Sequence, residues 1–146
     1  MYRVVHSVGR LVEIAIWSPV SLDEVQQWGR DHDAVVGSVG EPYVCLVDLR
    51  GATVFPLDVV QAYVSLMKAE QELVRTATML PESPMVAMQI GRMIREAGHP
   101  QRQAFDDAEA LLGWLGEVLG PMERVRVRAL LEDSAPSERL VPKTPR

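Results

Sequence analysis

The feature that most constrains the fold of this chain is the stretch over residues 43–62, YVCLVDLRGATVFPLDVVQA. It opens with a run that is apolar on both faces until Asp48, as in an interior strand covered on both sides. A polar turn follows, and Pro56 suits a first helical turn because the N–H that it lacks has no helical partner there. Apolar residues then recur at helical spacing as far as residue 76, which predicts a long helix with one apolar face.

The residues before this unit predict a hairpin and a capped helix. Two Val- and Ile-rich segments within residues 2–17 flank Gly9, which is typical of two paired strands joined by a tight turn. Ser21 and Glu24 have the spacing of a capping box, so we expect a helix from this point to residue 36.

The residues after the unit predict shorter elements. These are a strand over 85–89, a brief helix around Met93 and Ile94, a strand over 103–105, and a final helix with Leu111, Trp114, Leu115 and Val118 on its core face. The order β-β-α-β-α-β-α-β-α predicts an α/β fold, a single domain over residues 1–120 with a mixed sheet of about five strands and about four helices. Residues 121–146 are rich in Pro, Ser and charge, so we expect a partly disordered tail.

Composition narrows the cellular setting and the partners. The chain has 146 residues and a formal net charge of −5, with its acidic side chains concentrated in residues 1–120, so phosphate repulsion argues against a nucleic-acid partner. No apolar run is long enough to span a membrane, and the first residues lack the zones of a signal peptide. Cys45 is the single cysteine and lies in an apolar run, so we expect a buried thiol, no internal disulfide and a cytoplasmic location.

The residue types that most often carry catalysis are scattered. His6, His32 and His99 lie in separate segments, and no pair of them has the spacing of zinc ligands. The turn at Gly51 has neither the glycine pattern of a phosphate loop nor a Walker lysine. We therefore expect a non-enzymatic protein without a metal or cofactor.

Three stretches follow one another in the order of a known family. Residues 12–24 hold a strand, a polar turn and a capped helix start, residues 48–60 read DLRGATVFPLDVV, and residues 105–115 read FDDAEALLGWL. Together they resemble the STAS fold, specifically the SpoIIAA-like group of small bacterial proteins related to anti-sigma-factor antagonists. The resemblance covers residues 2–119 and implies a regulatory domain.

One position departs from the family pattern. In members that are controlled by phosphorylation the turn resembles DLSGVTFIDSSG, and the resemblance implies a phosphoacceptor serine at the start of the helix. In this chain Pro56 and Leu57 stand where Asp and Ser would, and Asp58 stands at the following Ser. Leu57 has no hydroxyl, so we expect no kinase-controlled switch at this helix. Thr53 is the nearest substitute, and the alternative role for it is local hydrogen bonding in the turn.

The favoured interpretation is a non-catalytic regulatory or protein-interaction module. The candidate partner-binding residues are Asp48, Arg50, Thr53, Phe55 and Asp58, on the turn and at the start of the second helix. Phe55 would be a binding hot spot if it faced solvent. The alternative is that Phe55 fixes the helix start onto the core. We expect Asp48 to tie the backbone of the turn.

The alternative function is a carrier of a small apolar or lipid ligand, because some members of the group resemble lipid-binding SEC14-like domains. Methionines between residues 67 and 93 could line an adaptable pocket; they are Met67, Met79, Met85, Met88 and Met93. A solvent-exposed cavity on the order of several hundred Å³ that is lined by these methionines would favour the carrier. A filled core with an apolar patch near Phe55 would favour the interaction module. A homodimer is also left open.

Overall fold

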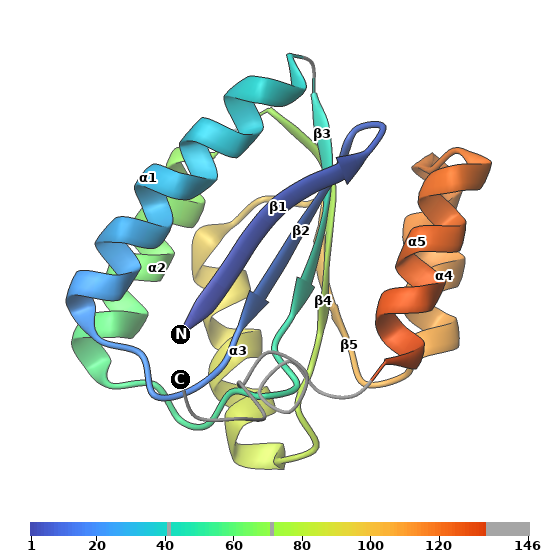
Figure 1. The fold of residues 1–146 in the computed structure, drawn as a ribbon. Coiled ribbons are helices and arrows are strands. Elements are labelled where there is room, and N and C mark those ends of the chain that lie inside the picture. The colour runs from blue at the N-terminus through green and yellow to red at the C-terminus, as the bar shows by residue number, and fades with distance from the viewer. Residues whose placement is uncertain (41, 71, 134–146) are drawn as a thin grey trace, which may run out of the picture.

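A mixed sheet of five strands runs through the centre of the molecule, as the computed structural model of residues 1–40, 42–70 and 72–133 describes it (Figure 1). The strands are β1 (Tyr2–Val8), β2 (Leu11–Ile16), β3 (Tyr43–Asp48), β4 (Leu73–Met79) and β5 (Arg102–Phe105). They lie in the order β1-β2-β3-β4-β5, with β1 antiparallel to β2 and the other neighbours parallel. The strand at the centre is β3, in agreement with its apolar composition.

Helices cover both faces of this sheet (Figure 1). On one face lie α1 (Leu22–Val39), α2 (Leu57–Ala69) and α3 (Pro84–Ala97), each of which connects two neighbouring parallel strands. Because the strand order advances in one direction, right-handed connections place all three helices on the same face. The opposite face is covered by α4 (Ala108–Leu115), the short 3-10 helix η1 (Gly116–Val118) and α5 (Pro121–Glu132).

Each face of the sheet has its own apolar core, and β3 contributes to both. Cys45 lies in the core under α1, α2 and α3, whereas Val44 and Leu46 lie in the core under α4 and α5. All three side chains are at most 2% exposed. The prediction that β3 is covered on both sides is therefore confirmed, and so is the prediction that the Cys45 thiol is buried.

The predicted fold class is confirmed. The α/β class, the mixed five-stranded sheet and the order of elements agree with the structure. The part of the chain that the structure describes has five α-helices rather than about four. Ser21 caps α1 with both hydrogen bonds of the expected capping box. On the predicted core face of the final helix, Leu111 and Leu115 are fully buried, and Trp114 and Val118 are partly buried.

The prediction that the second helix runs to residue 76 is wrong. This helix ends at Ala69, and the residues after it form β4. Leu73 and Val74 continue the helical spacing of α2 by coincidence. The alternation of β-branched residues at Val74, Thr76 and Thr78 favours a strand, and this strand occupies the sheet position next to β3.

The strand predicted over residues 85–89 is also wrong, because these residues belong to α3. The Ser83 hydroxyl accepts the N–H of Val86 at 3.4 Å, and Pro84 takes the first helical position. Ser83 followed by Pro84 is therefore a helix start signal in the sequence. The prediction took Pro81 and Pro84 as the signs of a loop instead. The fourth strand of the expected order lies earlier in the chain, at β4.

The segment after Gly120, for which composition predicts a tail, begins with α5. Val127, Leu130 and Leu131 of this helix are buried against the second face of the sheet. Residues 134–146 of the expected tail lie outside the described residues. An open apolar sheet face needs a cover, and α5 supplies part of it, so the helix is part of the folded unit.

Candidate functional site

The turn after β3 is held by an ion pair between Asp48 and Arg50. The buried Asp48 carboxylate accepts the backbone N–H of Arg50 at 3.1 Å and the Arg50 guanidinium at 3.0 and 2.8 Å. The prediction that Asp48 ties the turn backbone is confirmed. The Arg50 guanidinium also donates to the carbonyls of Leu130, Leu131 and Asp133, at 3.0–3.3 Å. Arg50 therefore connects the turn to the end of α5.

Phe55 faces the core rather than solvent. Its side chain is 4% exposed, and its ring centroid lies 6.0 Å from that of Tyr63. The Gln89 side chain holds the Phe55 backbone from α3, donating to its carbonyl and accepting its N–H, both at 2.9 Å. The interpretation of Phe55 as an exposed hot spot is therefore wrong, and the alternative, that it fixes the helix start onto the core, agrees with its position.

Thr53 and Asp58 are the exposed members of the candidate set. The Thr53 backbone N–H donates to the Ser18 hydroxyl at 2.9 Å, and the Asp58 carboxylate accepts the N–H of Val59 at 2.8 Å in the first turn of α2. The structure thus does not bring the five candidates onto one surface. Phe55 packs into the core under α1, α2 and α3, Asp48 and Arg50 connect to α5, and Thr53 and Asp58 are exposed. A partner-binding role for them stays a prediction.

Leu57 is the first residue of α2 and is 71% exposed. The N-cap residue Pro56 makes no capping hydrogen bond with its side chain. The position that resembles the phosphoacceptor site is thus at a helix start, as expected, but it presents an apolar side chain to solvent.

Leu57 belongs to a surface groove between α2 and α3. The groove has a volume of about 510 Å³ and includes four exposed apolar side chains: Val54, Leu57, Met85 and Met88, which are 50–72% exposed. Val54 and Leu57 follow β3, and Met85 and Met88 follow β4. Neighbouring parallel strands end at the same edge of a sheet, which is where α/β folds most often bind ligands. We call these four residues the apolar groove.

Sequence reasoning named Met85 and Met88 as pocket-lining candidates but did not place them on one face beside Leu57. Met85 and Met88 were expected in a strand, where they would lie on opposite faces. In α3 they are three positions apart and share one face. The Ser-Pro start of the helix was the signal that could have found them.

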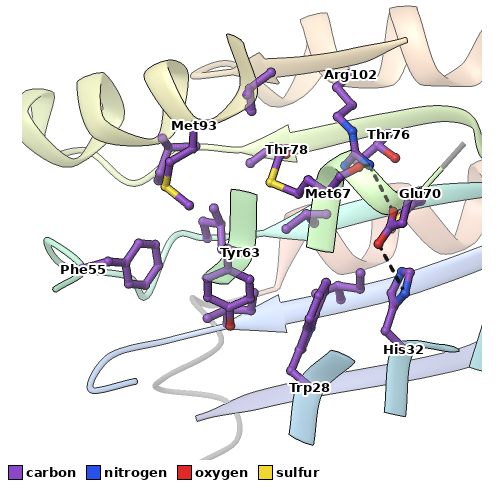
Figure 2. Close-up of a pocket in the computed structure, with 17 residues that line it drawn as sticks. Trp28, His32, Phe55, Tyr63, Met67, Glu70, Thr76, Thr78, Met93 and Arg102 are labelled. Atoms are coloured by element: carbon purple, nitrogen blue, oxygen red, sulfur yellow. Dashed lines mark hydrogen bonds and ion pairs between the residues drawn. The ribbon is translucent and has the colours of Figure 1, made fainter. Parts of the chain in front are cut away.

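A second hollow lies beneath the surface, between the sheet and α1, α2 and α3 (Figure 2). This cavity has a volume of about 70 Å³. Phe55, Tyr63 and Met93 line one end of it, and a charged cluster lines the other (Figure 2). Phe55 and Met93 line both the cavity and the surface groove.

The charged cluster centres on Glu70. One carboxylate oxygen lies 3.3 Å from Nδ1 of His32, and the other accepts Nη2 of Arg102 at 3.1 Å and the Tyr43 hydroxyl at 2.8 Å. Figure 2 shows the chain of contacts from Arg102 through Glu70 to His32. The Arg102 side chain is 6% exposed and the Glu70 side chain is 15% exposed, so their ion pair is shielded from water.

Burial controls the protonation of the groups around this cavity. Burial lowers the pKa of His32, against the opposing effect of the Glu70 and Asp33 carboxylates, and so favours the neutral imidazole. Burial raises the pKa of the Cys45 thiol and of the Tyr43 hydroxyl. Cys45 is therefore held as a thiol, which is a poor nucleophile.

Three of the five methionines proposed to line a ligand pocket, Met85, Met88 and Met93, line the surface groove. Met93 also lines the cavity, together with Met67, and Met79 packs against the core under α4 and α5. Within the described residues, no group of three or more His, Cys, Asp or Glu side chains is arranged to hold a metal ion. None of the described helices is long and apolar enough to cross a bilayer.

No family model and no curated protein matches this chain.

Proposed function

We propose that the protein is a non-catalytic interaction module of the STAS type, which binds a protein partner in the apolar groove. The observation that supports this proposal best is the exposure of Val54, Leu57, Met85 and Met88 side by side at the starts of two helices. Contiguous exposed apolar side chains mark interaction sites on protein surfaces. Methionine side chains adapt to the shape of a bound partner, which suits them to such a surface.

The chemistry of the groove favours a protein segment with an apolar face, such as an amphipathic helix. A groove between two helices accepts such a helix through apolar side chains spaced along one face. The rim carries Arg92 and Glu96, whose charges cancel, together with Gln61. An anionic membrane surface attracts clustered basic residues instead.

The proposed surface includes the helix start at which related proteins carry their switch serine. Leu57 supports a partner interaction that does not depend on phosphorylation of this helix. We also propose a cytoplasmic location, which the single, buried Cys45 supports.

The carrier interpretation has less support. The cavity of about 70 Å³ is smaller than the pockets of roughly 300–1,000 Å³ that hold drug-sized ligands. The groove of about 510 Å³ has the volume expected of a carrier and is lined by Met85, Met88 and Met93. Its apolar side chains are 50–72% exposed, however, and a ligand pocket buries most of the surface of its ligand. The apolar patch beside Phe55 favours the interaction module, although the core is not completely filled. We therefore do not propose lipid transport as the function.

Two double variants, one in the groove and one as its control, test the proposal. Leu57→Ser with Met88→Ser changes two groove side chains, and Met122→Ser with Val125→Ser changes two comparably exposed side chains on α5, at the opposite face. Both variants should keep the melting temperature of the unmodified chain, because exposed side chains contribute little to stability. Partner capture from cells of the source organism, quantified by mass spectrometry, should fall at least tenfold for the groove variant alone. Equal capture by both variants would overturn the proposal.

A further inference from the structure

The described part of the chain ends near the apolar groove, at the C-terminal end of α5. The Asp133 carbonyl accepts the Arg50 guanidinium at 3.0 Å, and the Leu130 carbonyl accepts it at 3.2 Å. Arg50 lies in the turn after β3, four positions before Val54, which lines the groove. The end of α5 and the starts of α2 and α3 lie at the same end of the sheet (Figure 1).

The sequence after Asp133 contains one apolar pair that is long enough in reach for this groove. Residues 134–146 read SAPSERLVPKTPR, and the pair is Leu140 and Val141. The seven residues from Asp133 to Leu140 extend up to about 25 Å. The four residues from Arg50 to Val54 span at most about 14 Å. The difference leaves room for the length of the Arg50 side chain, so Leu140 can reach the groove.

The groove suits an apolar segment of this kind. Its four apolar side chains are 50–72% exposed, and covering them with aliphatic groups removes apolar surface from water. The charges of Arg92 and Glu96 at the rim cancel, so the contact itself is decided by apolar side chains.

Charge over the whole chain also favours this occupant. Residues 134–146 hold three Lys or Arg and one Glu, a net charge of +2. The total is −5, so residues 1–133 hold −7. The field of the acidic domain therefore attracts the basic segment to its surface.

The covalent connection lets even a weak contact fill the groove. A segment joined through a short linker has an effective concentration on the order of 1 mM. If a separate peptide bound with a dissociation constant of that order, the connected segment would occupy the groove about half of the time. A second copy of the chain at a much lower concentration has no such advantage.

We propose that residues 139–142 bind the apolar groove of their own chain, with Leu140 and Val141 as the contacts. This binding needs no partner. The regulation that follows from it rests on the proposed function, because a partner would have to displace the segment before it enters the groove.

Paramagnetic relaxation in the purified full chain tests this inference without any partner. Thr144→Cys provides the site for a nitroxide label, because the natural Cys45 is buried away from the reagent. The label should enhance relaxation of the Met85 and Met88 methyl groups, which line the groove, severalfold more than that of Met122. Met122 is the internal reference, since it begins α5 on the opposite face of the sheet.

Leu140→Ser with Val141→Ser is the matched control. It keeps the length and the charge of the segment and removes its aliphatic contacts. The relaxation enhancement at Met85 and Met88 should fall severalfold in this variant. A chain that ends at Asp133 provides the positions of the two methyl signals in an empty groove, and the serine variant should reproduce them.

Three results would overturn the inference. The first is no enhancement at Met85 and Met88. The second is equal enhancement with and without the serine changes, which would mean that the connection alone brings the label near the groove. The third is full enhancement between a nitroxide-labelled chain and a separate, isotopically labelled chain, which would make a second copy the occupant. None of these decides whether the groove binds a protein partner, which the capture experiment tests separately.

Discussion

Arg50 connects two layers of the molecule through one side chain. It pairs with the buried Asp48 and donates to three carbonyls at the end of α5. It was expected to be a surface charge on a binding turn. The structure gives it a structural role instead, because removing it leaves a buried carboxylate without its cation.

Arg50→Ala should therefore lower the free energy of unfolding by about 3 kcal/mol, the usual cost of breaking a buried ion pair. Asp58→Ala is the control, since Asp58 is exposed and its loss should change stability by no more than about 0.5 kcal/mol. Urea unfolding of the two variants measures the difference. Equal midpoints for Arg50→Ala and the unmodified chain would contradict the structural role.

His32 makes stability depend on pH. The groups that face it are Glu70 from the end of α2, Tyr43 from β3 and Arg102 from β5, with Asp33 beside it in α1. Its pKa in the folded state lies below the ordinary value of 6.5, so the unfolded chain takes up the proton first as pH falls. Stability from this source is complete above pH 6.5 and is lost as pH falls from there toward the lowered pKa.

We expect the unmodified chain to lose stability as pH falls below 6.5, and His32→Gln to lose less. The slope of unfolding free energy against pH, measured by urea unfolding, is the quantity to compare. If the slope of His32→Gln matched that of the unmodified chain, His32 would not be the source.

Among the elements, α5 is one that we expect the fold to require. It buries Val127, Leu130 and Leu131, and Arg126 donates two hydrogen bonds of 2.9 Å to the buried Glu13 on β2. A chain that ends at Gly120 should lose cooperative unfolding in thermal melts, because one face of the sheet is uncovered and Glu13 is unpaired. A chain that ends at Asp133 keeps α5 and should melt cooperatively. Cooperative melting of the shorter chain at the original temperature would show that α5 is dispensable.

The start of α2 carries the prediction about phosphorylation. Leu57 occupies the position that resembles the acceptor site, so phosphopeptide mapping from cells of the source organism should find no stoichiometric phosphate at this helix start. Thr53 is exposed and close in sequence, so it is the residue to examine most carefully. Stoichiometric phosphate on Thr53 would contradict the prediction and indicate a displaced acceptor.

The elements also show how far the sequence alone can be interpreted. The hairpin, the capping box at Ser21 and β3 were predictable because each has a local pattern that tertiary contacts do not override. The end of α2 was not, because Leu73 and Val74 fit a helix and a strand equally well in a short window. To predict the helix over residues 84–97, we would have had to give the capping signal at Ser83 more weight than the neighbouring prolines, which favour a loop.

The site was less predictable than the fold, for a physical reason. Arg50 and Phe55 lie close together in sequence, in the turn after β3. Only the tertiary structure shows that Phe55 packs under α3 and that Arg50 reaches α5. The ion pair between Glu70 and Arg102 joins the end of α2 to β5, and the sequence does not show it when the helix is extended to residue 76. Sites built from several elements require correct assignment of every element.

At the scale of the whole molecule, one sheet separates two layers with different roles. The layer of α4 and α5 completes the core and anchors the turn through Arg50. The helices α1, α2 and α3 form the second layer (Figure 1). This layer contains the cavity and, where α2 and α3 begin, the apolar groove. The exposed positions on α5, Met122 and Val125, lie on the other layer and provide internal controls for any test of the groove.

The most direct test of the interaction proposal is photocrosslinking in cells of the source organism. A photoreactive phenylalanine analogue is placed at Met88 in one chain and at Met122 in another; the two positions are equally exposed, at 72%. The account predicts that position 88 crosslinks to one defined protein and that position 122 does not. If the crosslinked protein were a second copy of this chain, the partner would be that copy and the complex a homodimer. No crosslink from position 88, or the same crosslink from both positions, would contradict the account.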